Sequence, residues 1–252
     1  MLNFESEHSS ELVSMQSSYL EEIDTAIIKP NLSILEEKDP SLLNGFKIIF
    51  NKEIPIEIKL QTKNGEKNLA SFEPIRCKLL IDNINENKKP NHIKIELSCE
   101  NDIYFHFTKI IDEKEFLDIK KKQNLNITFS QFSELFEKIC ENCRASPNEY
   151  ICFFLINRKS NSVLKFLKNS DFKFLELLLL EFERSPEEVI NKQIIYRFTI
   201  LKSKLDYEKK CIKKVGDIIV GKNPDILQPI LENNDKYNLN VYKYFGKSLL
   251  GK

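Results

Sequence analysis

One stretch late in the sequence comes close to a phosphate-binding loop. Residues 216–223, GDIIVGKN, nearly match G-x-x-x-x-G-K-[ST], in which backbone amides cradle phosphates and the last hydroxyl holds magnesium. Asn223 has no hydroxyl, the loop interior is bulky Ile-Ile-Val, and a lysine-rich helical pattern, not a strand, precedes it. The sequence therefore argues against nucleotide binding here.

Cysteines and histidines are the next residues that could do chemistry. Cys140 and Cys143 have the spacing of half a zinc site or of a redox pair, but no second such pair or paired histidines complete a site. Both lie along or beside an apolar helical stripe, where a free thiol packs as a small hydrophobe. His8, His92 and His106 are far apart and no nucleophile motif accompanies them. We predict no catalytic residue, no metal and no cofactor, and hence no enzyme.

Lysine clusters raise the question of nucleic-acid binding. They form two groups, Lys120-Lys121-Lys122 and Lys209-Lys210 with Lys213-Lys214. Neither group has the interleaved aromatic or arginine residues typical of nucleic-acid recognition, so solvated faces are the better interpretation. Across the chain 38 basic and 38 acidic residues cancel, which leaves no overall field to attract nucleic acid or an anionic membrane.

The composition is that of a globular protein with an acidic beginning. With 252 residues, 41% of them hydrophobic, the chain can build one or two domains with a real core. Residues 1–44 hold nine acids against Lys29 and Lys38 and show no periodicity, so we predict a disordered tail there. Lacking a secretory signal or an apolar run of membrane-spanning length, the sequence predicts a soluble, intracellular protein.

Residues 45–184 have the pattern of a β-rich head domain with a helical insertion. Strands are expected at 46–50, 54–60, 75–84, 92–98, 101–111, 125–129, 150–157, 163–168 and 173–182. Phe116, Leu117 and Ile119 lie at helical spacing and predict a short helix over 112–124. A second helix is predicted from its N-cap Ser130 and an apolar stripe made of Phe132, Leu135, Phe136, Ile139 and Cys143.

A helix is predicted over residues 185–215. Ser185-Pro186-Glu187-Glu188 has the residue types of a capping box with proline at the first helical position. Alternating steps of four and three then define a heptad seam, which either pairs with another helix or packs on the sheet: Ile194, Phe198, Leu201, Leu205, Glu208, Ile212, Val215 and Ile219. Gly216, Gly221 and Pro224 are expected to end it, leaving about three heptads, which rarely hold helices together alone. Residues 216–252 are predicted to be a polar, mobile tail.

An aromatic residue stands beside a polar turn. In residues 167–182, LKNSDFKFLELLLLEF, the turn formers Asn169, Ser170 and Asp171 separate two apolar runs of strand length, and Phe172 follows them. Phe172 either tucks under its own hairpin or is offered to a partner. This stretch alone favours the first alternative, because most large apolar residues near turns cap the local core.

Three segments resemble the spindle assembly abnormal protein six family, the centriolar cartwheel proteins. FNKEIPIEIKL at 50–60 resembles the family's opening strand. Residues 102–143 follow its signature of paired aromatics, an acidic turn and an F-x-x-LF-x-x-I helix. LKFLKNSDFKFLELLLLEF at 164–182 resembles its strand, N-x-F turn and leucine-rich strand. The resemblance covers about residues 46–205. Because so few heptads follow, the chain is most similar to the short "like" branch of the family.

The resemblance implies both a fold and a function. The expected fold is mainly β with helices (α+β): a small β-barrel or sandwich head with a helical insertion, similar to the heads of DNA end-joining scaffold proteins, followed by a helix. Family heads pair through an aromatic or aliphatic hairpin residue, which implies a homodimer contact at Phe172 with Ser170 and Asp171. The candidate helix seam comprises Ile194, Phe198, Leu201, Leu205 and Ile212.

From this resemblance we predict a non-enzymatic cytoskeletal assembly protein that self-associates through its head. The expected location is the basal body, centriole or apical complex, with other cytoskeletal proteins as further partners. Two alternatives stay open. One is a DNA-repair scaffold of the related fold, and the other is an adaptor that binds another protein through the Phe172 loop.

Overall fold

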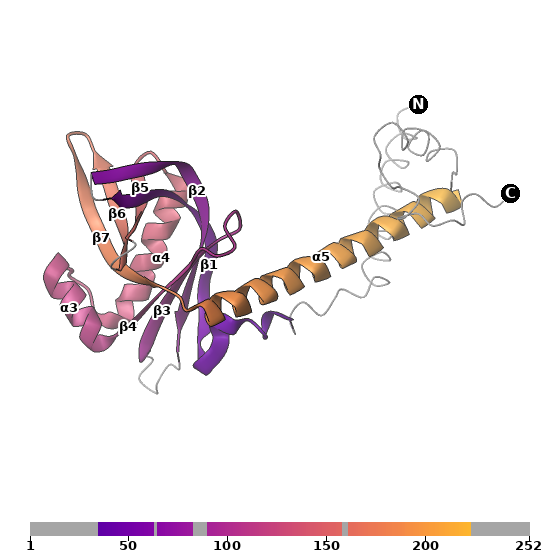
Figure 1. Ribbon diagram of the computed structural model, residues 1–252, viewed down its shortest axis with the longest axis horizontal. Coiled ribbons are helices and arrows are strands. Elements are labelled where there is room, and N and C mark those ends of the chain that lie inside the picture. Colours follow the sequence, from indigo (N-terminus) through magenta and orange to yellow (C-terminus); the bar gives the residue numbers. More distant parts are fainter. Residues whose placement is uncertain (1–34, 63–64, 83–89, 158–160, 223–252) are drawn as a thin grey trace, which may run out of the picture. The chain divides into compact units, whose positions relative to one another are not determined.

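The structure is a computed structural model, and it describes residues 35–62, 65–82, 90–157 and 161–222 (Figure 1). The chain divides into two units: the head, Asp39–Tyr196, and a second unit of residues 1–38 and 197–252. The elements in chain order are η1 (Pro40–Gly45), β1 (Lys47–Thr62), β2 (Gly65–Ile81), β3 (His92–Cys99), β4 (His106–Asp112), α3 (Glu113–Gln123), α4 (Phe129–Ala145), β5 (Tyr150–Ile156), β6 (Ser162–Ser170), β7 (Lys173–Arg184) and α5 (Glu187–Lys222).

The described strands form a closed barrel in the order β1-β2-β3-β4-β7-β6-β5. Neighbouring strands are antiparallel except at the closure, where β1 and β5 run parallel over four residue pairs from Glu57↔Phe153 to Leu60↔Ile156. The predicted class, a β-rich head with a helical insertion, is therefore confirmed. The ladder between β4 and β7 consists of two pairs, Phe107↔Arg184 and Thr108↔Glu183.

Helix α3 continues the barrel wall where the β4–β7 ladder stops. The side-chain amide of Gln123 donates to the carbonyl of Leu179 at 2.7 Å, and its oxygen accepts from the Leu179 N–H at 2.9 Å. One amide side chain thus takes the place of a strand residue beside β7. An unpaired, half-buried backbone group costs free energy. These two hydrogen bonds therefore stabilise β7 where it no longer pairs with β4.

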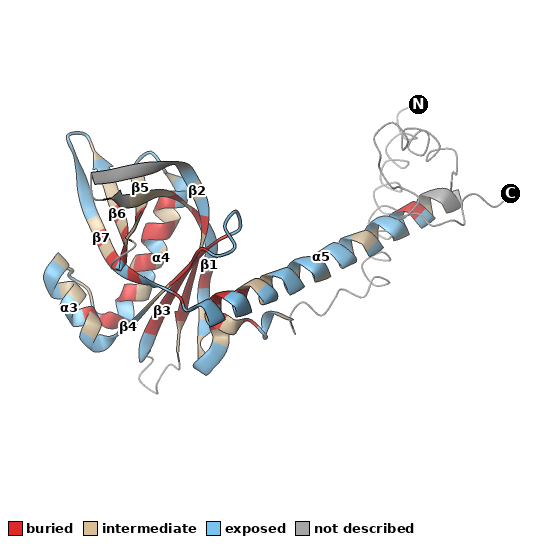
Figure 2. Ribbon diagram, in the orientation of Figure 1, coloured by how far each residue is buried: buried red, intermediate tan, exposed pale blue. Residues whose placement is uncertain are grey.

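Phenylalanines dominate the core inside the barrel. Phe154 of β5 lies against Phe105, Phe107 and Phe182, with ring centroids 4.8–6.0 Å apart and steep interplanar angles. Such edge-to-face pairs add to the burial of apolar area. Helix α4 packs its predicted stripe inward, since Phe132, Phe136, Ile139 and Cys143 are all buried and Leu135 is partly buried. The stripe prediction is confirmed, and Figure 2 shows the buried residues on this helix.

Three local predictions about the head are wrong. The segment 125–129 is not a strand, because Leu125 and Ile127 pack against the core from a loop and so reproduce the alternation of a strand. The N-cap of α4 is Thr128, which forms a capping box with Gln131, and not Ser130. The segments 46–50 and 54–60, predicted as two strands, belong to the single strand β1, whose register shifts near its start.

The last helix is longer than predicted. Helix α5 runs from Glu187 to Lys222 and passes through Gly216 without ending. Glycine costs a helix interior only about 1 kcal/mol, far less than proline, so Gly216 is tolerated and the boundary at 215 was wrong. The residues of the phosphate-loop-like motif up to Lys222 are helical and form no loop. The rest of the predicted C-terminal tail, 223–252, lies outside the described residues.

The head begins earlier than predicted. Residues 1–34 of the predicted acidic tail lie outside the described residues, but Asp39–Asn44 belong to the head. Asp39 accepts from the Ser41 N–H at 2.8 Å and so caps η1. Both residues are buried, which corrects the boundary at residue 45. Composition alone cannot place them, because a capped polar turn and a disordered polar segment use the same residue types.

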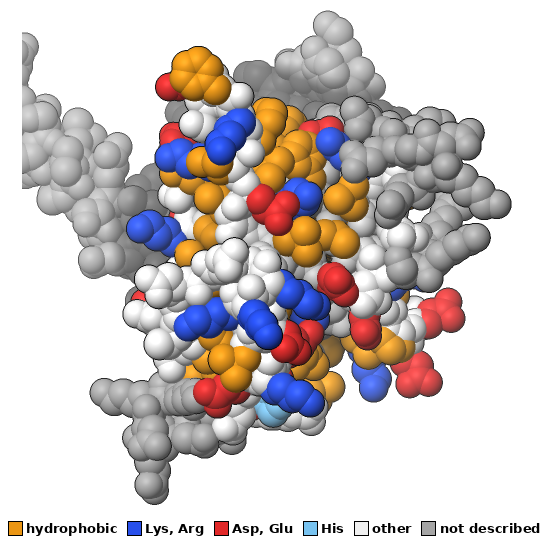
Figure 3. Space-filling view, turned by 90° about the vertical axis from the view of Figure 1, so that its left-hand side faces the viewer, with side chains coloured by type: hydrophobic (Ala, Val, Ile, Leu, Met, Phe, Trp, Pro, Cys, Tyr) orange, Lys and Arg blue, Asp and Glu red, His pale blue; other side chains and the backbone are white. Residues whose placement is uncertain are grey.

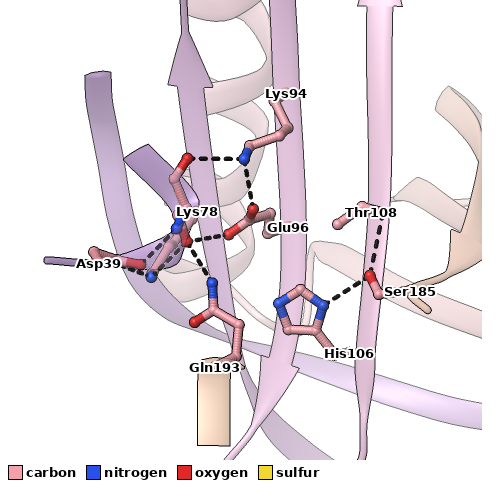
Figure 4. A network of polar contacts seen from close by, with 9 residues as sticks. Asp39, Lys78, Lys94, Glu96, His106, Thr108, Ser185 and Gln193 are labelled. Atoms are coloured by element: carbon pink, nitrogen blue, oxygen red, sulfur yellow. Dashed lines mark hydrogen bonds and ion pairs between the residues drawn. The ribbon is translucent and has the colours of Figure 1, made fainter. Parts of the chain in front are cut away.

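A buried polar cluster joins η1 to the outer face of the sheet and to the start of α5. We call it the Ser41 cluster, and it comprises Asp39, Ser41, Lys78, Lys94, Glu96 and Gln193 (Figure 4). Lys78 of β2 lies 2.6 Å from the Asp39 carboxylate, and on β3 the Lys94 ammonium lies 2.9 Å from Glu96. Two cations and two anions therefore balance beneath η1.

Ser41 is the residue that the other members share. Its hydroxyl donates to Glu96 and accepts from Lys78 at 3.1 Å. The Gln193 amide of α5 donates to the same hydroxyl at 2.9 Å, and the backbone carbonyl of Ser41 accepts from Lys94 at 2.8 Å. Among the described residues, every buried side-chain nitrogen and oxygen has a partner. The cluster thus fixes the first turns of α5 to the head.

Disrupting the Ser41 cluster should destabilise the head in a pH-dependent way. Burial opposes ionisation of Asp39, but Lys78 and the Ser41 hydrogen bonds outweigh it and hold the pKa of Asp39 below its ordinary value. Asp39→Ala leaves Lys78 buried without its carboxylate, so we expect a loss of about 3 kcal/mol at pH 7 in urea unfolding. A carboxyl whose pKa is lowered on folding loses its stabilising effect as pH falls. The difference from wild type should therefore shrink below about pH 4.

The matched control for this prediction is the exposed pair between Glu53 and Arg76, 2.5 Å apart. Glu53→Ala removes one carboxylate from a solvated site and should cost less than about 1 kcal/mol. Equal losses for the two variants would mean that the Ser41 cluster contributes no more than a surface ion pair.

Candidate interaction site on the β6–β7 hairpin

The hairpin between β6 and β7 ends in a two-residue turn. Ser170 pairs with Lys173, which leaves Asp171 and Phe172 as the turn residues. Positive φ values occur among the described residues only at Asn44, Gly45 and Asn124. Phe172 therefore has an ordinary backbone conformation, and a bulky side chain is tolerated at this position.

The side chain of Phe172 points away from the protein. It is 98% exposed, more than any other large hydrophobic residue among those the structure describes. Phe174 and Leu175, just inside the turn, are exposed as well. Figure 3 shows hydrophobic side chains interspersed with charged ones on this face, up to its upper edge. The alternative in which Phe172 tucks under its own hairpin is wrong.

Neighbouring residues brace the hairpin near its tip. Asn169 donates its backbone N–H to the Glu149 carbonyl at 2.7 Å, and its side-chain amide reaches the Asn148 carbonyl at 3.4 Å. Lys168 lies 3.1 Å from the Glu149 carboxylate. The hydrogen bond to Glu149 is the largest cause of a raised pKa of Lys168, and the hydrogen bond to Tyr150 is the second. The loop before β5 thus fixes the end of β6. The turn that carries the exposed Phe172 ring follows directly after this fixed end.

The second predicted surface is the heptad seam of α5. Phe198, Leu201, Leu205 and Ile212 are exposed, whereas Ile194 is partly buried. Figure 2 colours most of the described part of α5 beyond its first turns as exposed or intermediate. Phe198 onward belongs to the second unit, whereas the hairpin belongs to the head. The pairing of this seam with another helix therefore stays a prediction.

The remaining candidate residues serve packing and local structure. Cys140 and Cys143 are buried, as predicted, and burial raises the pKa of Cys143 to about 12. His92 pairs with Asp82 at 2.6 Å, and His106 lies 2.8 Å from the Ser185 hydroxyl (Figure 4). Within the described ranges no three His, Cys, Asp or Glu residues are placed to hold a metal ion.

The lysine groups also have structural surroundings. Lys120 donates to the Ile127 carbonyl at 2.8 Å, and Lys120–Lys122 occupy the last turn of α3, where positive charge is favourable. Lys209, Lys210, Lys213 and Lys214 lie on α5. No helix in the described part of the chain has the length and apolar character to cross a membrane.

Sequence reasoning missed Asp39, Ser41 and Gln193, whose role depends on contacts between distant segments. The one signal available was on β3, where Lys94, Glu96 and Ser98 alternate with apolar residues and yet are buried. Alternation normally indicates a solvated outer face. Nothing in the strand itself shows that η1 and α5 cover that face.

A closed, mainly antiparallel barrel with a helical insertion, an exposed aromatic at a hairpin tip and a following helix is the architecture that the sequence resemblance implies. The family model described as "Centriolar protein SAS N-terminal domain" matches residues 48–182. The chain belongs to the SAS-6 family, a family of structural centriole proteins.

Known relatives agree with this assignment. The chain is 25% identical over 180 residues to the "Spindle assembly abnormal protein 6 homolog" of Gallus gallus, covering 68% of this chain and 27% of the relative. It spans only about a quarter of the length of the two vertebrate relatives that it matches.

Two solved structures share the fold. An N-terminal fragment of Leishmania SAS-6 that contains part of its coiled coil matches with a TM-score of 0.54 at 14% identity, over 66% of this chain and 94% of that one. The N-terminal coiled-coil dimer of C. elegans SAS-6 matches with a TM-score of 0.53 at 12% identity, over 65% and 94%. The predicted fold class is confirmed.

The exposure of Phe172 predicts that it contributes little to the stability of the folded head. In urea unfolding followed by far-ultraviolet circular dichroism, we expect Phe172→Ala to change the free energy of unfolding by less than about 0.5 kcal/mol. Phe166 is the matched control, because it lies on the same hairpin but is fully buried. Phe166→Ala should cost about 3–5 kcal/mol. A similar loss for both variants would place Phe172 in the monomer's own core.

Proposed function

We propose that this chain is a non-enzymatic cytoskeletal assembly protein that self-associates through its head. In this proposal Phe172 enters an apolar pocket on the head of a second copy, with Ser170 and Asp171 at the edge of the contact. The observation that carries the proposal is the 98% exposure of Phe172 on a braced two-residue turn. The turn keeps this large aromatic side chain exposed to water. Covering it with a partner would lower the free energy of the system.

The head contact should be weak by itself. Burying one aromatic side chain contributes about 1.5–3 kcal/mol, and Phe174 and Leu175 add apolar area beside it. Association costs about 4 kcal/mol or more in lost freedom of motion. A small contact of this kind suits an assembly that is stabilised by several simultaneous contacts, because each further contact then forms at high effective concentration.

Family membership supports a location in the cytoskeleton. The vertebrate relatives are named for spindle assembly, and the matching family model describes a centriolar protein. We infer that the chain works in the cytoskeleton, at the centriole, basal body or apical complex, together with other cytoskeletal proteins. The dimer named for the C. elegans protein supports self-association as the mode of assembly.

One alternative rests on the same observation. An adaptor that binds a different protein through the Phe172 loop would also expose this aromatic, so only a self-association measurement separates the two proposals. Family membership favours an assembly protein over the DNA-repair scaffold considered from the sequence.

A charge at the hairpin tip should abolish head self-association. Phe172→Glu would place a carboxylate in the apolar pocket, where an unpaired charge is strongly unfavourable. In sedimentation velocity over a wide concentration range, we expect the wild-type chain to shift to larger species and the variant to lose the part of the shift that the head causes. Phe72 is a half-exposed aromatic on β2, and Phe72→Glu is the control that should leave self-association unchanged.

Two results would contradict the proposal. If the wild-type chain shows no concentration dependence, the adaptor becomes the better explanation of Phe172. If Phe72→Glu and Phe172→Glu reduce association equally, the effect comes from net charge and not from a contact at the hairpin.

A further inference from the structure

The part of α5 that follows the head is strongly basic. Residues 197–215 hold seven basic and two acidic residues, a formal net charge of +5 in a chain whose total is zero. We call this range the α5 basic stretch. Among the described residues only one of its six lysines has an ion pair: Lys209 lies 4.0 Å from Asp206, an exposed pair that neutralises little charge. Most of the lysine charge therefore has no matching acid in the part of the chain that the structure describes.

Half of these lysines lie on the side of α5 away from the heptad seam. With Phe198 and Leu205 at position a, the outer positions f, b and c are occupied by Lys210, Lys213 and Lys214. The other three occupy the flanking positions e and g beside the seam: Lys202, Lys204 and Lys209. An anionic segment can therefore contact the outer lysines while another helix occupies the seam.

The opposite charge is found near the start of the sequence. Residues 1–34, which lie outside the described residues, hold six acids and one base, a formal net charge of −5. We call this range the acidic segment. In the rest of the chain, apart from these two ranges, acids and bases cancel, so the acidic segment and the α5 basic stretch carry equal and opposite charge.

The two segments are attached to neighbouring points of the head. The head begins at Asp39 and ends at Tyr196, so the chain continues from these residues into the two segments. Lys78 lies close to both, because its ammonium is 2.6 Å from the Asp39 carboxylate and 5.8 Å from the centre of the Tyr196 ring (Figure 4). The acidic segment is thus joined to the head, through residues 35–38, beside the point where α5 leaves it.

This connection brings the acidic segment within reach of the lysines. The α5 basic stretch is about 27 Å long at 1.5 Å per residue, whereas an extended chain with the length of the acidic segment can span up to about 110 Å. Chain length therefore does not limit the contact. A short covalent connection gives an effective concentration on the order of mM, so a weak electrostatic attraction is enough to hold the two segments together.

We propose that the acidic segment docks on the outer lysines of the α5 basic stretch of the same chain. The contact is electrostatic, so salt weakens it, and it leaves the heptad seam open to a second copy. When two α5 helices pair through their seams, their lysines come close to one another, and an acidic segment docked on each helix offsets the repulsion. The proposal does not rest on the head contact at Phe172.

A peptide with the sequence of residues 1–34 tests whether the lysines are already occupied. The peptide carries a fluorescent label, and its binding to the full chain is followed by anisotropy at low salt. In the wild-type chain it must displace the tethered acidic segment and should bind weakly. An acid-free variant should bind it at least about tenfold more tightly, and added salt should reduce this difference. The acid-free variant combines six substitutions: Glu5→Gln, Glu7→Gln, Glu11→Gln, Glu21→Gln, Glu22→Gln and Asp24→Asn.

A head variant controls for the change of net charge. It neutralises six exposed acids of the head and leaves the acidic segment intact, so it should bind the peptide as weakly as the wild-type chain does. Its substitutions are Glu53→Gln, Glu100→Gln, Glu113→Gln, Asp118→Asn, Glu134→Gln and Glu181→Gln.

Two triple variants, both made in the acid-free chain, locate the binding surface. The first removes the outer lysines and should weaken peptide binding at least about tenfold: Lys210→Gln, Lys213→Gln and Lys214→Gln. The second removes the same charge from exposed positions of α3 and should leave most of the affinity in place: Lys114→Gln, Lys121→Gln and Lys122→Gln. Circular dichroism on both variants checks that helix content is unchanged.

Several outcomes would overturn the proposal. If the wild-type chain binds the peptide as tightly as the acid-free variant does, the lysines are open and their occupant is an acidic segment of another protein. If neither chain binds it, the two segments do not attract one another. Equally tight binding by the head variant and the acid-free variant would reduce the effect to net charge. Equal losses from the two triple variants would mean that the outer lysines are not the docking surface.

Discussion

Closure of the barrel with an odd number of strands is the constraint on which the rest of the head depends. Seven strands that alternate in direction around a ring bring two like-directed strands together, and here these are β1 and β5. Strand β5 therefore joins β1 by a short parallel ladder and ends its pairing with β6 at Lys168. The last residues of β6 and the turn extend beyond that ladder. Their inner side is supported by the Glu149 carbonyl, which accepts the Asn169 N–H. The exposed tip thus lies beyond the last residue pair between β5 and β6.

The usual distribution of polar and apolar side chains is inverted at the Ser41 cluster, at Phe172 and along the last helix. Lys78, Lys94 and Glu96 are buried under η1, where fully satisfied hydrogen bonds fix a single arrangement. Phe172 and the heptad seam of α5 are in contrast exposed to water. Burying charge does not by itself add stability, and exposing apolar area loses some. Both features are explained if the head must hold the start of α5 in one orientation while leaving two surfaces free for partners.

Features that depend on neighbouring residues can be predicted from the sequence. The prediction fails for features that depend on contacts between distant segments. The α4 stripe and the hairpin follow from periodicity and turn chemistry, which act over a few residues. The exposure of Phe172 did not follow from its own stretch, because a capping aromatic and an exposed one have the same local pattern. Gly216, predicted with Gly221 and Pro224 to end the last helix, does not end it, because one glycine costs a helix interior only about 1 kcal/mol. Asp39 and Ser41 looked like tail residues, since only Glu96 and Gln193, far along the chain, show why they are buried.

The hairpin tip is suited to a contact between copies that is weak by itself. It is nearly neutral in its immediate turn, with Asp171 beside Lys173, and so does not repel a second copy. A contact centred on one aromatic is weak, because association costs about as much free energy as the burial of the ring contributes. If the head contact is weak, copies assemble only where a second contact already holds them together, because the head contact then forms at high effective concentration.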